Sequence, residues 1–65
     1  MNIDSKVMTT HGAGTIRGKD YVKDAGEFVW TGRWGVLHDV YPEEKPVGMY
    51  TGDLLYYMEE DLEEL

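Results

Sequence analysis

The 65-residue chain contains no cysteine, only two prolines, and only six basic residues against thirteen acidic ones. Without cysteine it forms no disulfide framework and no cysteine-ligated zinc site, and it has no thiol nucleophile. The absence of cysteine also fits a reducing compartment, so we expect a cytoplasmic protein. The usual covalent and metal supports of a miniature domain are therefore missing, and the fold must rest on a small hydrophobic core.

Long apolar runs are missing as well. The longest is the five-residue stretch 54–58, whereas a transmembrane helix needs about 20 apolar residues. Residues 1–6 carry an acid before the first base and lead into no apolar segment, so we expect neither a signal peptide nor a membrane anchor. Two Trp, five Tyr and one Phe, with a hydrophobic content of 42%, indicate a folded chain instead. We expect one domain spanning residues 1–65.

The negative charge is concentrated at one end of the chain. The net charge is −7, yet residues 1–52 hold six bases and seven acids, whereas residues 53–65 hold six acids and no base. The overall balance argues against a generally basic nucleic-acid binder. The near-neutral first part still permits a local basic patch, and the acidic segment is a candidate binding face of its own.

Short β-branched and aromatic segments between glycine-rich turns predict a mainly β domain. We expect strands over residues 5–10, 15–22, 27–31 and 34–38, and a brief extended piece at 49–51. The link Thr31-Gly32-Arg33 is short enough for a hairpin turn or a bulge. Period-2 alternation predicts which side chains form the core: Val7, Ile16, Phe28, Trp30, Val36, Leu55 and Leu62.

Residues 54–65 admit two interpretations. Their leucines and Met58 have helical spacing, and Asp53 suits an N-cap, which together favour a helix. Alternatively, residues 54–58 form a strand and residues 59–62 a turn, which the adjacent tyrosines favour. The residues alone leave both open.

Three segments resemble small SH3-like barrels of the KOW, Tudor, CAP-Gly and CarD types. Residues 6–16, KVMTTHGAGTI, are similar to their first two strands around a glycine turn, and residues 32–36, GRWGV, to their central strand. Residues 56–65, YYMEEDLEEL, are similar to their closing strand and the helical turn that often follows. The resemblance implies an all-β, five-stranded SH3-like barrel with a short C-terminal helical turn. The compact acidic form also resembles small accessory proteins of bacteriophages.

Candidates for catalysis or metal binding are few. His11 and His38 are the only histidines, and their spacing matches no ligand motif, whether Asp4 or Asp39 is added as a carboxylate. The single serine has no nucleophile-elbow context, and residues 12–14 lack the third glycine of a phosphate loop. A core of this size also leaves little room for a pocket. We expect no enzymatic activity, no metal site and no cofactor.

The aromatic residues outnumber what so small a core can bury, and exposed aromatic rings are typical of interaction sites. We therefore expect a non-catalytic interaction module whose protein partner has a basic surface complementary to the acidic end. Two simpler roles stay open: tyrosines that cap the barrel and acids that provide solubility. The residues expected to bind protein are Trp34, Tyr50, Tyr56, Glu59, Glu60, Asp61, Glu63 and Glu64.

The alternative function is nucleic-acid binding by a local basic-aromatic patch. Arg33 adjoins Trp34 in the sequence, and such a patch can stack single-stranded bases while its cations hold phosphates. The bases expected to take part are Lys6, Arg17, Lys19, Lys23 and Arg33.

Overall fold

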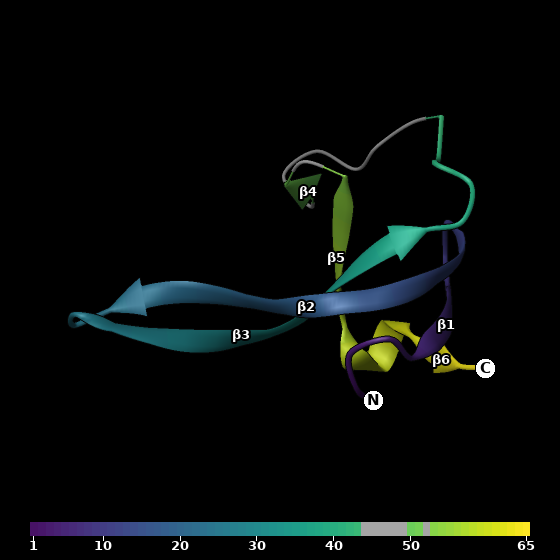
Figure 1. Ribbon diagram of the computed structural model, residues 1–65. Coiled ribbons are helices and arrows are strands. Elements are labelled where there is room, and N and C mark those ends of the chain that lie inside the picture. Colours follow the sequence, from purple (N-terminus) through teal and green to yellow (C-terminus); the bar gives the residue numbers. More distant parts are fainter. Residues whose placement is uncertain (44–49, 52) are drawn as a thin grey trace.

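The computed structural model describes residues 1–43, 50–51 and 53–65, which form one antiparallel β-sheet and one turn of 3₁₀-helix (Figure 1). The strand order is β4-β5-β3-β2-β1-β6. The mainly β class and the short helical turn near the C-terminus are confirmed. The elements are β1 (Lys6–Thr9), β2 (Gly12–Asp24), β3 (Glu27–His38), β4 (Tyr50–Thr51), β5 (Leu54–Met58), η1 (Glu59–Asp61) and β6 (Glu63–Glu64).

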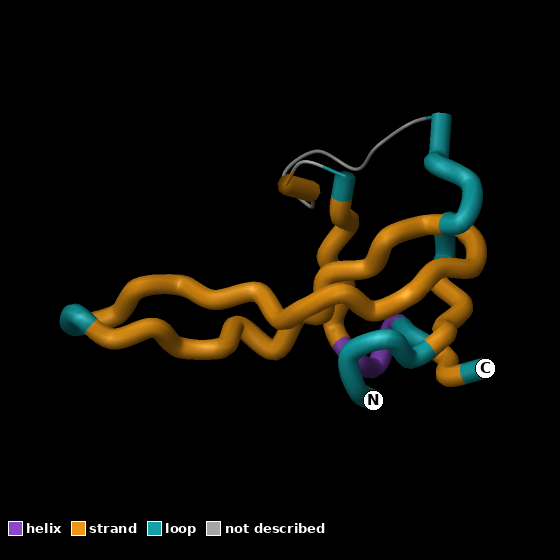
Figure 2. The backbone as a smooth tube through the Cα atoms, in the orientation of Figure 1, coloured by secondary structure: helices purple, strands orange, loops and turns teal. Residues whose placement is uncertain are grey.

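The long strands β2 and β3 belong to two different regions of the molecule. Their inner parts are residues 12–19 and 34–38, where β1 pairs with residues 12–15 of β2 and β5 pairs with residues 33–37 of β3. Their outer parts, residues 21–30, pair only with each other in the described chain. We call the inner parts, together with β1, β5, η1 and β6, the body, and residues 21–30 the arm. Figure 2 shows the arm projecting away from the body, and the whole molecule measures 36 × 24 × 17 Å.

The hydrophobic core lies entirely in the body. Alternate residues of each body strand point into it, which confirms the period-2 pattern there. Its members are at most 9% exposed: Val7, Ile16, Trp34, Val36, Leu55, Tyr57 and Leu62. The core prediction is wrong for Phe28, which is 74% exposed, and for Trp30, which is 38% exposed. Both alternate as expected, but they lie on the arm, where no second layer of described residues covers them.

Residues 27–31 and 34–38 form one strand, and the link between them is a bulge rather than a hairpin turn. Between the pairs Lys19↔Trp34 and Tyr21↔Trp30, three residues of β3 stand opposite one of β2. Gly32 adopts a φ of 91°, a conformation that side-chain-bearing residues rarely adopt. The bulge therefore separates the arm from the body. We call residues 20 and 31–33 the junction.

Hydrogen bonds centred on Asp20 hold the junction. The Thr31 hydroxyl donates to Asp20 Oδ2 at 3.0 Å, and Arg33 Nε lies 3.5 Å from the same oxygen. The Arg33 backbone N–H donates to Thr31 Oγ1 at 3.2 Å. The Arg33 N–H, which the bulge removes from the ladder, thus finds a partner within the junction.

The C-terminal segment follows the strand interpretation. β5 pairs with β3 over five residues, and it places Leu55 and Tyr57 in the core. The chain then turns through η1, and β6 pairs with β1. Burial of an alternating pair decides against the helix, which would have exposed one of the two. The two-residue β4 lies within the predicted extended piece 49–51.

The sheet is open. Its edge strands β4 and β6 have no pairing with each other among the described residues, so the closure that a barrel implies is not formed. Both edge strands are only two residues long, which limits the edge that each exposes. Among the residues that the structure describes, no helix has the length and apolar character required to cross a membrane.

Candidate functional site

The arm carries large apolar side chains on both of its faces. The register sets Tyr21 opposite Trp30 on one face and Val22 opposite Val29 on the other. Phe28 adds a third ring to the first face, opposite Lys23. Between 38% and 74% of each apolar residue is exposed. No other strand covers either face in the described structure, so these residues form a run of uncovered apolar side chains on the ribbon of β2 and β3.

One face of the arm combines aromatic rings with positive charge. Lys19 Nζ lies 4.5 Å from the centroid of the Trp30 ring and 5.2 Å from that of Trp34. The two indole rings meet edge to face at 5.3 Å, and Trp30 Nε1 donates to the Arg33 carbonyl at 2.9 Å. Trp30 is thereby fixed in place although it is partly exposed. We call Tyr21, Lys23, Phe28 and Trp30 of the arm, together with the adjoining Lys19 of the body, the basic-aromatic face.

The opposite face of the arm is apolar and acidic. Asp24 pairs with Glu27 beside the turn at residues 25–26, and alternation places both on the side of Val22 and Val29. We call these four residues the valine face. The arm therefore offers two chemically different faces on one two-stranded ribbon.

The expectation that Trp34 is an exposed binding residue is wrong. Trp34 is 5% exposed, and its Nε1 is buried without a hydrogen-bond partner in the described structure. It lies in the core beneath Trp30 and Lys19, so it supports the basic-aromatic face from below. The exposed rings are those of Tyr21, Phe28 and Trp30, none of which had been predicted to bind a protein.

The predicted basic residues do not gather into one patch. Two of them, Lys19 and Lys23, lie on the basic-aromatic face, and no described carboxylate lies within ion-pair distance of either. The other three lie on the body and the junction, each in an ion pair: Lys6 with Asp39 at 3.4 Å, Arg17 with Asp4 at 2.9 Å and Arg33 with Asp20 at 3.5 Å. The patch that the sequence suggested around Arg33 is thus neutralised by Asp20.

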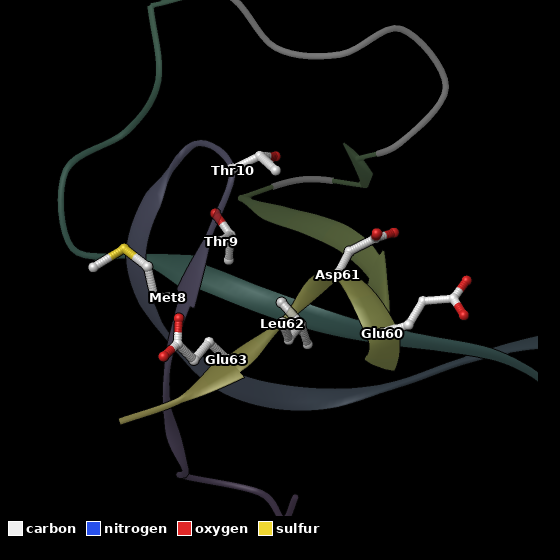
Figure 3. A pocket seen from close by; sticks show the side chains of 7 residues that line it. All are labelled: Met8, Thr9, Thr10, Glu60, Asp61, Leu62 and Glu63. Carbon is white, nitrogen blue, oxygen red and sulfur yellow. The ribbon is translucent and has the colours of Figure 1, made fainter.

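The predicted acidic residues form a separate surface on the body. Glu59, Glu60 and Asp61 make up η1, while Glu63 and Glu64 make up β6, and all five are exposed. Glu60, Asp61 and Glu63 line an open hollow of about 300 Å³ whose other lining residues are Met8, Thr9, Thr10 and Leu62. Figure 3 shows Leu62 between Met8 and Thr9 on one side and Glu60 and Asp61 on the other. We call the five acids the acidic surface.

The two remaining predicted residues, Tyr50 and Tyr56, lie near the β5 edge of the body. Tyr56 is half-buried, because its ring packs over Gly35, where a Cβ would lie 2.9 Å from Tyr56 Cε1. The backbone of Tyr50 belongs to β4, and its side chain lies outside the described residues.

The two histidines, far apart in the sequence, meet at the hydroxyl of Tyr57. His38 Nε2 lies 2.8 Å from Tyr57 Oη and His11 Nδ1 lies 2.9 Å from it. Thr9 Oγ1 donates to the same oxygen at 3.4 Å. His38 and Tyr57 are buried, whereas His11 is exposed on the turn between β1 and β2. We call His11, His38 and Tyr57 the histidine–tyrosine cluster.

Burial shifts the titration of the two inner members of this cluster. Desolvation lowers the pKa of His38, and repulsion from His11 adds to the effect, against smaller opposing contributions from Asp39 and the Ala13 carbonyl. His38 Nδ1 is buried, and no group in the described structure meets it with full hydrogen-bond geometry. Desolvation raises the pKa of Tyr57, and the Thr9 hydrogen bond partly offsets this.

Neither carboxylate considered with the histidines joins them. Asp4 pairs with Arg17 and Asp39 with Lys6. No group of three His, Cys, Asp or Glu side chains suited to a metal is found among the residues that the structure describes. The third group that meets the two histidines is a tyrosine, which spacing rules for metal ligands do not include.

Comparison with known proteins adds no family to this geometry. No protein-family model, no curated protein and no solved structure matches the chain. The function is therefore argued from the arm, the acidic surface and the body alone.

Proposed function

We propose that this protein is a non-catalytic interaction module that binds a protein partner through its arm. The main observation that supports this proposal is that five large apolar side chains are exposed on the two faces of a two-stranded ribbon. An isolated two-stranded hairpin is only marginally stable in water, and exposed apolar patches are typical of interaction sites. A partner that covers the arm removes both unfavourable features.

The chemistry of the arm suits a protein surface. Tyr and Trp are the residues that most often dominate protein interfaces, and Tyr21 and Trp30 stand side by side on the basic-aromatic face. Lys19 and Lys23 on that face favour a partner with nearby carboxylates. The outer edges of the arm also carry backbone groups that can accept another strand.

The acidic surface is proposed as a second contact, for a basic region of the same partner. It lies on the body, around η1 and β6, whereas the arm projects from the other end of β2 and β3 (Figure 1). Exposed carboxylates of this kind favour rapid association and selectivity more than tight binding. The two surfaces can therefore be tested separately.

We also propose an SH3-like relationship for the body. It is supported by two strands around the turn that bears His11, by the central strand β3, and by β5 with the helical turn η1 after it. A bacteriophage origin, a cytoplasmic location and the absence of enzymatic activity stay predictions.

The arm proposal is tested by immobilising the protein and comparing capture by matched variants. Phe28→Ser removes an apolar ring that is 74% exposed on the arm, and Val40→Ser removes an apolar side chain that is 81% exposed outside it. We expect Phe28→Ser to weaken binding of the captured partner at least 10-fold, as hot-spot truncation does. Val40→Ser should bind as the wild type does.

Equal binding by the Phe28→Ser and wild-type proteins would contradict the arm proposal. A further variant, with the five acids of the acidic surface replaced by Gln or Asn, tests the second contact. If this variant loses binding while Phe28→Ser still binds, the main contact lies on the body.

A second candidate function, binding of single-stranded nucleic acid, is favoured by the basic-aromatic face. Three exposed rings can stack on bases while Lys19 and Lys23 approach phosphates. Titration of random oligonucleotides at several salt concentrations separates the two functions. Micromolar affinity that falls steeply with salt would favour nucleic acid over protein, whereas no binding at low salt would exclude this candidate.

A further inference from the structure

The histidine–tyrosine cluster brings three potential metal ligands to one point of the body. His38 comes from the end of β3, His11 from the turn between β1 and β2, and Tyr57 from β5. Both imidazole nitrogens that face Tyr57 Oη lie within 2.9 Å of it. The cluster belongs to none of the surfaces proposed to bind a partner.

The Tyr57 hydroxyl is the hydrogen-bond partner of both imidazoles. The Tyr57 hydroxyl has a single proton, so it can donate to only one of the two imidazoles. The other ring must then present its own N–H to the same oxygen. A cation at this point would instead accept a lone pair from each of the three atoms.

We propose that the histidine–tyrosine cluster binds a divalent transition-metal cation such as Zn²⁺ or Cu²⁺ through His11 Nδ1, His38 Nε2 and Tyr57 Oη. Imidazole nitrogen is a preferred ligand of these cations. Ligands of a tetrahedral zinc ion lie about 2.0–2.1 Å from the metal and therefore roughly 3.3 Å from one another. The present separations of 2.8 and 2.9 Å need to widen by only about half an ångström to match that spacing.

The environment of the cluster allows this widening and favours a cation. His11 is exposed on a turn, so its ring can move away from Tyr57 Oη. The separation between the buried His38 and Tyr57 must widen by a small side-chain rotation. The exposed side of His11 leaves room for water as a further ligand. Asp39 acts electrostatically on His38, although its carboxylate also pairs with Lys6 at 3.4 Å, so the negative charge that it adds near the site is partly offset.

Coordination of a cation by Tyr57 Oη displaces the hydroxyl proton, which is released to solvent. The two imidazoles coordinate through nitrogen lone pairs.

The test measures the melting temperature of the whole chain with added ZnCl₂ and, separately, MgCl₂. At a hundredfold excess over its Kd, zinc should raise the melting temperature by roughly 10–20 °C, and magnesium should leave it unchanged. His11→Ala should abolish the zinc effect without unfolding the protein, because His11 is exposed. Tyr57→Phe keeps the ring and should weaken zinc binding at least 10-fold.

NMR identifies the ligands directly. Zinc should shift the ring signals of His11 and His38 and leave the Trp30 indole signal on the arm unchanged. A wild-type melting temperature that does not respond to zinc would overturn the proposal. So would zinc binding that survives in His11→Ala but disappears when Glu60, Asp61 and Glu63 are neutralised, which would place the metal on the acidic surface.

Discussion

The body and the arm are built from the same two strands but differ in what stabilises them. In the body, β2 and β3 have neighbours on both sides, and alternate side chains pack into one core. In the arm the same strands have neither flanking strands nor a covering layer among the described residues. Aromatic and β-branched residues continue along both regions, yet only those of the body are buried.

This difference shows that strand-forming sequence and burial are separate properties. The arm keeps the alternation of a sheet because cross-strand pairs such as Tyr21 with Trp30 stabilise it locally. Such pairs contribute only about 0.2–1 kcal/mol each, whereas burying a large apolar side chain contributes about 1.5–3 kcal/mol. The stability of the fold should therefore depend on the body, and binding on the arm.

The largest effect expected from this comparison is that of Leu55→Ala. Leu55 is fully buried on β5, opposite Val36, and the substitution should lower the free energy of unfolding by about 2–5 kcal/mol. A domain of this size has a total stability of only about 3–10 kcal/mol. Urea denaturation followed by tryptophan fluorescence measures the change. A loss below about 1 kcal/mol would show that the core is less tightly packed than the structure indicates.

The next effect is a contrast between two glycines of β2. An added Cβ at Gly14 would lie 2.6 Å from Val36 Cγ1 and 2.7 Å from the Leu37 carbonyl oxygen, whereas at Gly18 it would meet nothing within 4 Å. Gly14→Ala should therefore destabilise the protein by about 1–3 kcal/mol, because backbone cannot give way easily. Gly18→Ala should be neutral or stabilise it by up to about 1 kcal/mol.

Thermal unfolding of the two alanine variants checks this contrast, and each serves as the control for the other. Equal destabilisation by both would mean that the sheet is closely packed up to the bulge.

A smaller effect concerns pH, measured in buffer with chelator. The pKa of His38 is lowered in the folded state by burial, so between that value and about 6.5 the unfolded chain binds more protons than the folded one. Stability should therefore be full above about pH 6.5 and decline as pH falls below it. Burial raises the pKa of Tyr57, so stability should also decline above about pH 10.

Denaturation curves from pH 5 to 11 measure both changes. Tyr57→Phe should remove the decline at high pH, because it removes the hydroxyl whose pKa burial raises. A decline at low pH that persists unchanged in His38→Gln would assign it to other groups.

The sequence predicted the body well and the arm poorly, for a physical reason. Alternation identified Val7, Ile16 and Val36 as core residues, because period 2 determines which residues share a face. The same rule placed Phe28 and Trp30 in the core, since it does not say whether a face is covered. Coverage depends on where β1 and β5 end along β2 and β3, and these pairings are long-range.

The histidine–tyrosine cluster could not be predicted for the same reason. His11, His38 and Tyr57 become neighbours only through the combined register of four strands. The C-terminal strand could be predicted more easily, because Leu55 and Tyr57 alternate within one short segment. The feature that could have indicated an arm is the turn at residues 25–26, because the strand-forming segments on either side of it form one long hairpin.

The smallest effect on stability is expected for Phe28→Ala on the arm. Phe28 is 74% exposed, so the substitution removes little buried area and should change the free energy of unfolding by at most about 0.5 kcal/mol. Thermal and urea unfolding of Phe28→Ala and Leu55→Ala under the same conditions measure the smallest and the largest expected losses of stability. A loss above about 1 kcal/mol that grows with protein concentration would show that the arm is already covered by a second copy. A loss of that size independent of concentration would instead show that the arm contributes to the stability of the body, and the separation of the two regions would be wrong.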